Sequence, residues 1–268
     1  MKEIEIASFD EYREIISEHS LRKWIYRGQN NSNYKLESSL FRAFAKNASI
    51  FYRRKTTKKL KILKGRETEM LNSVKRNAHL FLEHYPKPKA DFDWLALMQH
   101  YGAPTRLLDF TFSPYIALYF AISGANLKPV AVYCIDYESF EKKQKERHGE
   151  NYENLCGRVL KYEKEIDKSV LICSEPEFSN TRLLAQQGVF LIPNTLDYSH
   201  EEILKHYGDD DCCIKIIIRF KCFRQIIEEL SKMNITAGTV YPGFEGFCKS
   251  FENIGSLSVR SIRHITNE

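Results

Sequence analysis

Short runs of β-branched and aromatic residues occupy the second half of the chain, whereas helical patterns lead the first half. This segregation is the feature that most constrains the fold. It predicts an α+β fold with a mixed, mostly antiparallel sheet, because the strand-like runs follow one another with few helices between them. The runs predicted as strands are 130–135, 169–173, 189–192, 213–220 and 237–241.

Capping residues and the spacing of apolar residues predict the helices. Ser8-Phe9-Asp10-Glu11 has the form of a capping box, so a short amphipathic helix is expected there. Asp93 is predicted to cap a helix that Gly102 closes, and Ser113-Pro114 predicts the start of a helix of small apolar residues. Further helices are expected at 58–83, which Pro86-Lys87-Pro88 would end, and at 223–233.

One short strand is predicted in the first half of the chain. Trp24-Ile25-Tyr26 is an aromatic and β-branched run typical of a buried strand, and Gly28 with the polar residues after it is expected to break the strand. Arg27 is therefore expected at a strand end. We find neither an internal repeat nor a Gly/Ser-rich linker, so the sequence predicts a single domain over 1–268.

Cysteine usage and hydropathy indicate a cytoplasmic protein without a membrane segment. Seven cysteines occur without a Cys-x-x-Cys pair, and the opening residues are too charged for a secretory signal. No apolar stretch approaches the roughly 18 to 20 residues that span a bilayer. A dedicated metal site is not expected, because the histidines at 100, 148, 200 and 206 are scattered along the chain.

Positive charge is in mild excess, with a net charge of +5, and is densest at 53–66. That run coincides with a predicted helix. It can be a solvated helix face or a contact for nucleic acid or phosphate, and the sequence leaves both interpretations open.

Three stretches resemble the bacterial FRG-domain family, which is named for an aromatic-Arg-Gly motif. They are Tyr26-Arg27-Gly28, then Gln-His-Tyr-Gly-Ala-Pro-Thr-Arg-Leu-Leu-Asp-Phe-Thr at 99–111, and Ala-Gln-Gln-Gly-Val-Phe at 185–190. The middle stretch continues through Ser113-Pro114 into the small-residue helix. The resemblance covers the chain from about residue 20 to 251.

The order of these motifs is also similar to that of ADP-ribosyltransferases, which transfer ADP-ribose from NAD. This resemblance implies an ADP-ribosyltransferase-like fold in which Arg27 holds the cofactor. It implies that Thr111 and Ser113 lie on the strand and helix start beside the ligand, and that Glu245 is the acidic residue at the reacting ribose. The chain departs from the family pattern, because it has no Ser-Thr-Ser triplet and no paired glutamates at Glu245.

The chemistry of NAD cleavage explains these residue types. Loss of nicotinamide passes through an oxocarbenium-like transition state that a carboxylate can stabilise, so Glu245 is predicted to be catalytic together with Arg27 and Ser113. The guanidinium of Arg27 can fork two hydrogen bonds to a diphosphate. The other residues predicted to bind the cofactor are Gly28, Thr111, Tyr119, Tyr101, Arg106 and Gln187.

Each of these residues also has a purely structural interpretation. Ser113 can be only a helix cap, Glu245 can complement a helix start, and Arg27 can form a strand-end ion pair. Arg106 and Asp109 can form a buried pair that fixes their loop or take part directly in catalysis, and the sequence leaves both interpretations open. His100 can act as a general base or cap the last carbonyls of its helix. Gln187-Gly188 can allow the backbone to pack closely before the strand at 189–192.

Three functions remain open from the sequence. The first is an NAD-dependent ADP-ribosyltransferase that modifies a protein or nucleic acid, as a toxin or anti-phage defence effector that an antitoxin restrains. The second is an inactive nucleotide-binding or sensing module, which the missing motifs favour. The third is a nucleic-acid-binding protein that uses the basic run at 53–66.

Overall fold

The computed structural model describes residues 1–43, 57–82, 88–125, 128–160, 169–177, 179–207 and 212–251. For 57–64 and 160 the description is limited to the backbone. Part of the basic run, 53–56, lies outside the described residues, and the side chains of 57–64 lie outside them too.

The described strands form one seven-stranded sheet in the order β1-β7-β4-β2-β3-β6-β5. Within it only β1 and β7 pair in parallel, so the α+β class and the mostly antiparallel sheet are confirmed. The strands are β1 (Lys2–Ile6), β2 (Trp24–Gln29), β3 (Leu108–Thr111), β4 (Val130–Asp136), β5 (Leu171–Ser174), β6 (Gly188–Pro193) and β7 (Cys213–Ile218).

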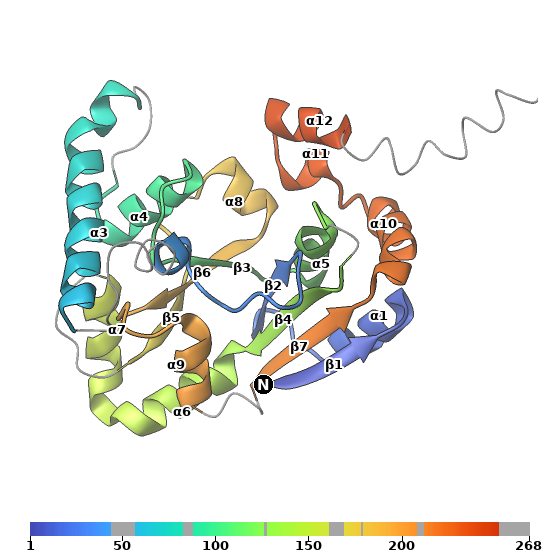
Figure 1. The fold of residues 1–268 in the computed structure, drawn as a ribbon, viewed down its shortest axis with the longest axis horizontal. Helices are drawn as coiled ribbons and strands as arrows, with labels where there is room; N and C mark the ends of the chain where they lie inside the picture. The colour runs from blue at the N-terminus through green and yellow to red at the C-terminus, as the bar shows by residue number, and fades with distance from the viewer. Residues whose placement is uncertain are drawn as a thin grey trace, which may run out of the picture.

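Helices cover both faces of this sheet (Figure 1). The described helices are α1 (Phe9–Ser17), α3 (Thr57–Asn77), α4 (Asp91–His100), α5 (Pro114–Ile122), α6 (Tyr137–His148), α7 (Tyr152–Leu160), α8 (Thr181–Ala185), α9 (His200–His206), α10 (Phe223–Lys232), α11 (Ala237–Val240) and α12 (Phe244–Ser250).

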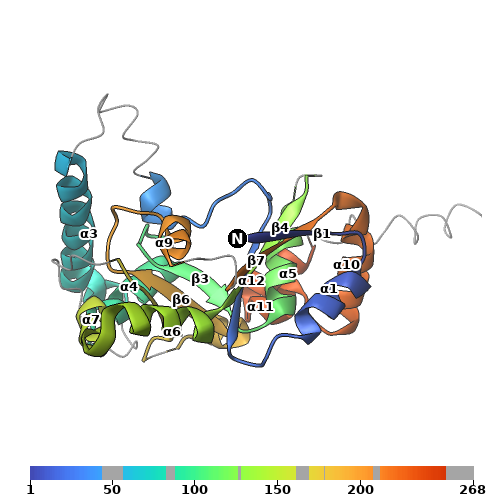
Figure 2. The same cartoon turned by 90° about the horizontal axis from the view of Figure 1, so that it is seen from below.

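The hydrophobic core consists of three main clusters. One cluster joins α1, α5 and α10 to one face of β2, β4 and β7, and a second joins α6 and α9 to the opposite face of β2 and β4. The third cluster packs α3, α4 and α7 against β5 and β6. Figure 2 shows the same division, with α1 and α10 at one end of the molecule and α3, α4 and α7 at the other.

Period-two alternation along β2 places its side chains on different sides of the sheet. Ile25 belongs to the cluster under α6 and α9, whereas Tyr26 belongs to the cluster under α5. By this alternation Arg27 follows Ile25 to the α6 and α9 face. Gly28 faces α5, and a Cβ atom there would overlap the carbonyl oxygen of Ala117. The glycine therefore permits close packing of α5 on β2.

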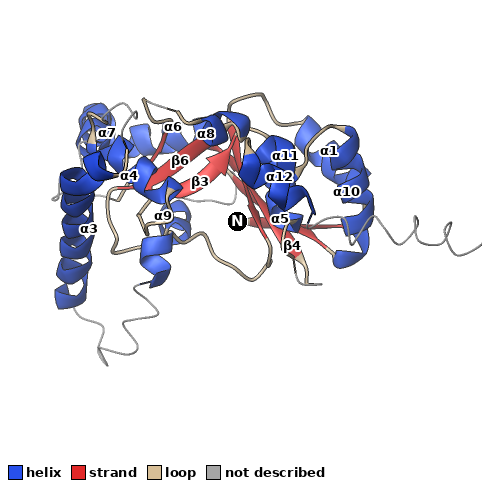
Figure 3. Cartoon of the chain, turned by 90° about the horizontal axis from the view of Figure 1, so that it is seen from above, coloured by secondary structure: helices blue, strands red, loops and turns tan. Residues whose placement is uncertain are grey.

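The two halves of the sheet separate at the junction of β2 and β3. These strands share a single register pair, Tyr26 with Thr111, whereas β2 pairs with β4 along its whole length. Figure 3 shows the half containing β3 and β6 diverging from the half containing β4. A gap in main-chain pairing thus opens beyond Tyr26, on the side where Arg27 and Asp109 lie.

The capping predictions at both serines are confirmed. Ser8 accepts a hydrogen bond from the main-chain nitrogen of Glu11, and Ser113 accepts one from that of Ile116 with Pro114 at the first helical turn. Gly102 follows the end of α4 with a φ of 85°, in the left-handed region that favours glycine. Local capping chemistry thus determined these boundaries.

Several boundaries differ from the sequence-based expectation. Strand β2 continues through Gly28 to Gln29, so Arg27 lies inside the strand, because α5 accepts the small residue that was expected to break it. Helix α4 begins before Asp93, whose carboxylate instead accepts from the main-chain nitrogen of Glu177. The segment 237–241 was wrongly predicted as a strand. Its buried Ala237 and Val240, three residues apart, form the helix α11.

Candidate functional site

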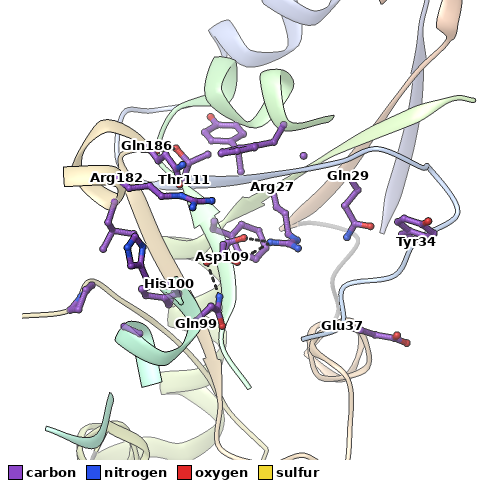
Figure 4. Close-up of a pocket in the computed structure, with 18 of the residues that line it drawn as sticks. Arg27, Gln29, Tyr34, Glu37, Gln99, His100, Asp109, Thr111, Arg182 and Gln186 are labelled. Carbon is purple, nitrogen blue, oxygen red and sulfur yellow. Dashed lines mark hydrogen bonds and ion pairs between the residues drawn. The ribbon is translucent and has the colours of Figure 1, made fainter. Parts of the chain in front are cut away.

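A cavity of about 950 Å³ lies where β2 and β3 separate. Its walls come from β2, β3, α4, α8 and the loop that follows β2. Figure 4 shows Arg27, Asp109 and Gln99 grouped near the centre, with His100, Arg182 and Gln186 on one side and Tyr34 and Glu37 on the other. The cavity is thus lined by polar groups from segments far apart in the sequence.

Arg27 is the most unusual charged group in this cavity. Its side chain is 20% exposed, and its Nη1 donates to the main-chain oxygen of Asp109 at 2.6 Å. The nearest carboxylate oxygen, Oδ2 of Asp109, is 3.9 Å from Nη1, which is too long for a hydrogen bond. Its Nε is buried and has no hydrogen-bond partner among the described residues. Burial lowers the pKa of Arg27, and the nearby Asp109 opposes that shift. Arg27 is therefore a largely desolvated cation with incomplete pairing.

Asp109 brings a carboxylate to the same place. Its side chain is 62% exposed, and Oδ1 accepts from Nε2 of Gln99 at 2.7 Å. The amide oxygen of Gln99 in turn accepts from the hydroxyl of Thr105, which is fully buried. The carboxylate is thus held in the cavity by a chain of hydrogen bonds that is anchored in the core.

A second cation, Arg182 of α8, lines the cavity near His100. Its Nη1 lies 3.7 Å from the carboxylate of Glu245, and its guanidinium carbon lies 4.7 Å from the ring centroid of Tyr241. Burial and the positive charge of Arg182 lower the pKa of His100, which favours the neutral imidazole at pH 7.

Three of the residues predicted from the sequence line the cavity: Arg27, Gly28 and Thr111. The hydroxyl of Thr111 donates to the main-chain oxygen of Gln186 at 2.7 Å and accepts from the main-chain nitrogen of Ser113 at 3.0 Å. It therefore ties the end of β3 to the corner before β6.

The other predicted ligand-binding residues do not line this cavity. Ser113 caps α5, and Tyr119 of α5 is 8% exposed within the core cluster. Tyr101 is 66% exposed beyond the end of α4. Gln187 is an exposed turn residue with a φ of 46°, and its neighbour Gln186 lines the cavity instead.

Arg106 is paired with Glu67 rather than with Asp109. Its Nη2 and Nε donate to Oε2 of Glu67 at 2.7 and 2.9 Å, and Nη1 donates to the main-chain oxygens of Pro193 and Asn194 at the end of β6. Glu67 is fully buried, so this is an internal ion pair that connects α3 to the loop before β3. The predicted Arg106–Asp109 pair is wrong, because α3 supplies the carboxylate from 39 residues away.

Glu245 lies in the first turn of α12, outside the residues that line the cavity. Its carboxylate is 2.8 Å from Nζ of Lys249 and approaches the cavity only through Arg182. A hydrogen bond from Lys249 lowers the pKa of Glu245 below its ordinary value. This geometry agrees with the structural interpretation of Glu245 at a helix start.

Sequence reasoning did not select Gln99 or Arg182, and it considered Asp109 only together with Arg106, either as a buried pair or in catalysis. Gln99 and Asp109 belong to the stretch 99–111, whose composition already stood out, so that stretch was a usable signal. Arg182 has no comparable motif. Its position follows from the packing of α8 beside α11 and from its ion pair with Glu245 of α12.

The described residues contain no cluster of three or more potential metal ligands. All seven cysteines lie within the described ranges, and none forms a disulfide there. Among the described helices, none combines the length and the apolar character needed to cross a membrane.

The FRG-domain model matches residues 22–129, a range that includes Arg27, Gln99 and Asp109. No curated protein and no solved structure matches the chain significantly. The family match and the three motifs coincide at the cavity, where the first two motifs supply Arg27 and Asp109 and the third supplies Gln186. Over residues 22–129 the chain is thus similar to the FRG domain.

Proposed function

We propose that the central cavity binds NAD and that the chain transfers ADP-ribose from it to a macromolecular acceptor. The observation that carries this proposal is Arg27, an incompletely paired and largely buried cation beside a carboxylate in a cavity of about 950 Å³. The acceptor, a toxic or defensive role and an antitoxin partner stay predictions.

The environment of Arg27 favours an anionic ligand. A buried guanidinium loses its hydration, and the loss is offset only by hydrogen bonds or by an opposite charge. Here one main-chain oxygen accepts from Nη1, while Nε has no partner among the described residues. A diphosphate would supply acceptor oxygens and negative charge, and the planar guanidinium suits bidentate binding.

The size and lining of the cavity suit a dinucleotide. Ligand cavities typically measure about 300 to 1,000 Å³, so this one is large enough for an extended ligand. Tyr26, Phe110 and Phe120 contribute aromatic surface to its walls, and Gln99 and Gln186 contribute amides. Aromatic faces can stack on an adenine or nicotinamide ring, and amides can bind ribose hydroxyls.

The proposed reaction needs no metal and no further cofactor. The bond between C1′ of the ribose and the nicotinamide nitrogen breaks, and nicotinamide leaves with the bonding electron pair. A lone pair of the acceptor then forms the new bond to C1′, and the acceptor loses a proton. With water as acceptor, the same step yields free ADP-ribose.

The test is nicotinamide release by the purified full chain, with NAD and either total protein or nucleic acid as acceptor. We expect release by the wild type and a loss of about 10- to 100-fold in Arg27→Met, because hydrogen bonds to charged groups contribute about 1.5 to 3 kcal/mol. Arg13→Met is the matched control, since Arg13 is 60% exposed on α1. A wild type that releases no nicotinamide with any acceptor would contradict the proposal.

A second candidate, a module that binds the nucleotide without cleaving it, is favoured by the position of Glu245 outside the cavity wall. Calorimetry separates the two candidates. Binding of NAD that Arg27→Met weakens, without nicotinamide release under any condition, would establish the binding module.

A further inference from the structure

The charge distribution in the cavity distinguishes one carboxylate from the others. Asp93 also lines the wall, but it is 6% exposed and its carboxylate accepts from the main-chain nitrogen of Glu177. Glu37 lies on the far side of Arg27 in Figure 4 and points away from Asp109. Asp109 is the carboxylate that lies beside Arg27 while remaining accessible to a ligand.

The hydrogen bonds of Asp109 leave one oxygen for a ligand. Gln99 donates to Oδ1, while Oδ2 is 3.9 Å from Nη1 of Arg27 and accepts no hydrogen bond from the described residues. An ionised carboxylate can accept several hydrogen bonds. Oδ2 is therefore open to a ribose hydroxyl or to a developing positive charge.

Hydrogen bonds at the nitrogen and at the oxygen of its side-chain amide fix the orientation of Gln99. Because an ionised Asp109 can only accept, the group of Gln99 that meets it must be the amide NH₂. The amide oxygen then faces the hydroxyl of Thr105, as observed. Thr105 is itself fixed, since its main-chain nitrogen donates to the hydroxyl of Ser39 at 3.1 Å and its hydroxyl accepts from the nitrogen of Leu107 at 3.2 Å.

Glu245, the carboxylate implied by the resemblance to ADP-ribosyltransferases, is placed differently. It is paired with Lys249 and Arg182, it is half exposed on α12, and it does not line the cavity. Asp109 comes instead from β3, within the central sheet. A carboxylate on a strand and held by a core-anchored amide is better placed to keep a fixed geometry.

We propose that Asp109 is the catalytic carboxylate of this cavity and that Gln99 is its positioning residue. This inference rests on the proposed NAD cleavage. As nicotinamide leaves with the bonding electrons, positive charge develops at C1′, and Asp109 stabilises that charge without forming a bond to it. The acceptor supplies the new bond to C1′ and releases its proton. Gln99 acts through Asp109 by fixing the direction of its oxygens.

The experiment compares Asp109→Asn, Glu245→Gln and the wild type with NAD. We measure NAD binding by calorimetry and the rate of nicotinamide release in a single turnover. For Asp109→Asn we expect a fall in release of about 100-fold or more, the range for loss of one electrostatic stabilising group, with the NAD Kd changed by less than about threefold. Asp10→Asn, 77% exposed on α1, is the matched control for the substitution.

Gln99→Met tests the positioning role. Its loss removes the donor to Oδ1, so kcat should fall about 10-fold with little change in KM. In a double-mutant cycle, the losses of kcat in Gln99→Met and Asp109→Asn should not add, because Gln99 acts through Asp109. A purely structural role for Gln99 would lower the melting temperature, and the two losses of kcat would then add.

The outcomes separate this inference from the proposed function. If the wild type releases nicotinamide and Asp109→Asn does so at the wild-type rate, Asp109 is not catalytic, although the cavity still cleaves NAD. The same conclusion follows if Glu245→Gln abolishes release while Asp109→Asn does not. If the wild type itself releases none, the proposed function and this inference both fail.

Discussion

Arg106 and Arg27 are both largely buried, and they differ in how fully they are paired. The side chain of Arg106 is 9% exposed, and it binds the carboxylate of Glu67 through two nitrogens and two main-chain oxygens through the third. Arg27 donates to one main-chain oxygen, and its buried Nε has no partner among the described residues. Arg106 is thus saturated by the fold, whereas Arg27 has donor capacity directed at the cavity.

The comparison shows how a structural arginine can be told from a functional one. Both lie in stretches that the family resemblance singled out, so the motif alone does not separate them. Burying a cation requires compensation in either case. The fold supplies that compensation to Arg106 through Glu67, and for Arg27 we propose that a ligand supplies it.

The largest expected effect is on the stability of the Arg106 region. Arg106→Met should lower the free energy of unfolding by about 3 to 5 kcal/mol, because it leaves the carboxylate of Glu67 buried without a counter-ion. Urea denaturation measures the loss. Combining it with Glu67→Leu should recover most of the stability, since a buried ion pair can be replaced by apolar residues at small cost. A single variant as stable as the wild type would break the comparison.

Ligand binding should stabilise the protein through Arg27. If NAD binds only the folded chain, a concentration about 100 times the Kd should raise the free energy of unfolding by about 2.7 kcal/mol. Thermal melts with and without NAD test this. A 10- to 100-fold weaker affinity in Arg27→Met should reduce the shift to about 0.4 to 1.4 kcal/mol, whereas Arg13→Met should keep the full shift. An undiminished shift in Arg27→Met would show that the ligand does not use Arg27.

Lowering the pH should reduce the free energy of unfolding through the buried His200. Burial lowers the pKa of His200 to about 3, and both Arg27 and Arg106 contribute to that shift. Below about pH 6.5, His200 takes up a proton in the unfolded chain but stays neutral in the folded chain. The free energy of unfolding therefore falls from about pH 6.5 towards pH 3. The loss is about 1.4 kcal/mol per pH unit, or about 2 kcal/mol at pH 5.

His200→Gln keeps a donor for the main-chain oxygen of Leu191 and removes the titrating ring. Denaturation of this variant between pH 7 and pH 5 should show a shallower fall in stability than the wild type. His206→Gln, at an exposed position on α9, is the control. Equal slopes in all three proteins would rule out His200 as the source.

The smallest expected effect is on the stability of the Arg27 region. Arg27→Met removes one hydrogen bond and also removes a desolvated cation, and these changes oppose each other. The free energy of unfolding should change by less than about 1 kcal/mol, measured by urea denaturation beside Arg106→Met. A loss as large as that of Arg106→Met would show that both arginines are structural.

Local chemistry explains which parts of the fold the sequence predicted. The caps at Ser8 and Ser113 depend on residues within three positions, and the strands at 130–135 and 189–192 depend on their own β-branched residues. The strand predicted at 237–241 failed because burial of Ala237 and Val240 on one side of a helix outweighed β-propensity. Strand β1, which the sequence did not predict, is stabilised by parallel pairing with β7 across the chain.

In the candidate site, too, local motifs predicted some residues, whereas others depended on packing. Arg27 and Thr111 were selected from motifs, and both line the cavity. Glu245 was selected by the same order of motifs but lies outside the cavity wall, because order along a chain does not determine which side chains share a cavity. The roles of Asp109 and Gln99 depended on a hydrogen bond across ten residues and on the separation of β3 from β2.

The sequence by itself determined the α+β class, the starts of α1 and α5 and the FRG-domain match over residues 22–129, because these depend on periodicity, capping and contiguous motifs. Only the tertiary structure decided that Arg106 pairs with Glu67, that Arg27 lies beside Asp109, and that the sheet separates between them. The two contacts join residues 39 and 82 positions apart. Such pairings depend on how helices and strands pack, so the local sequence does not specify which charged group meets which.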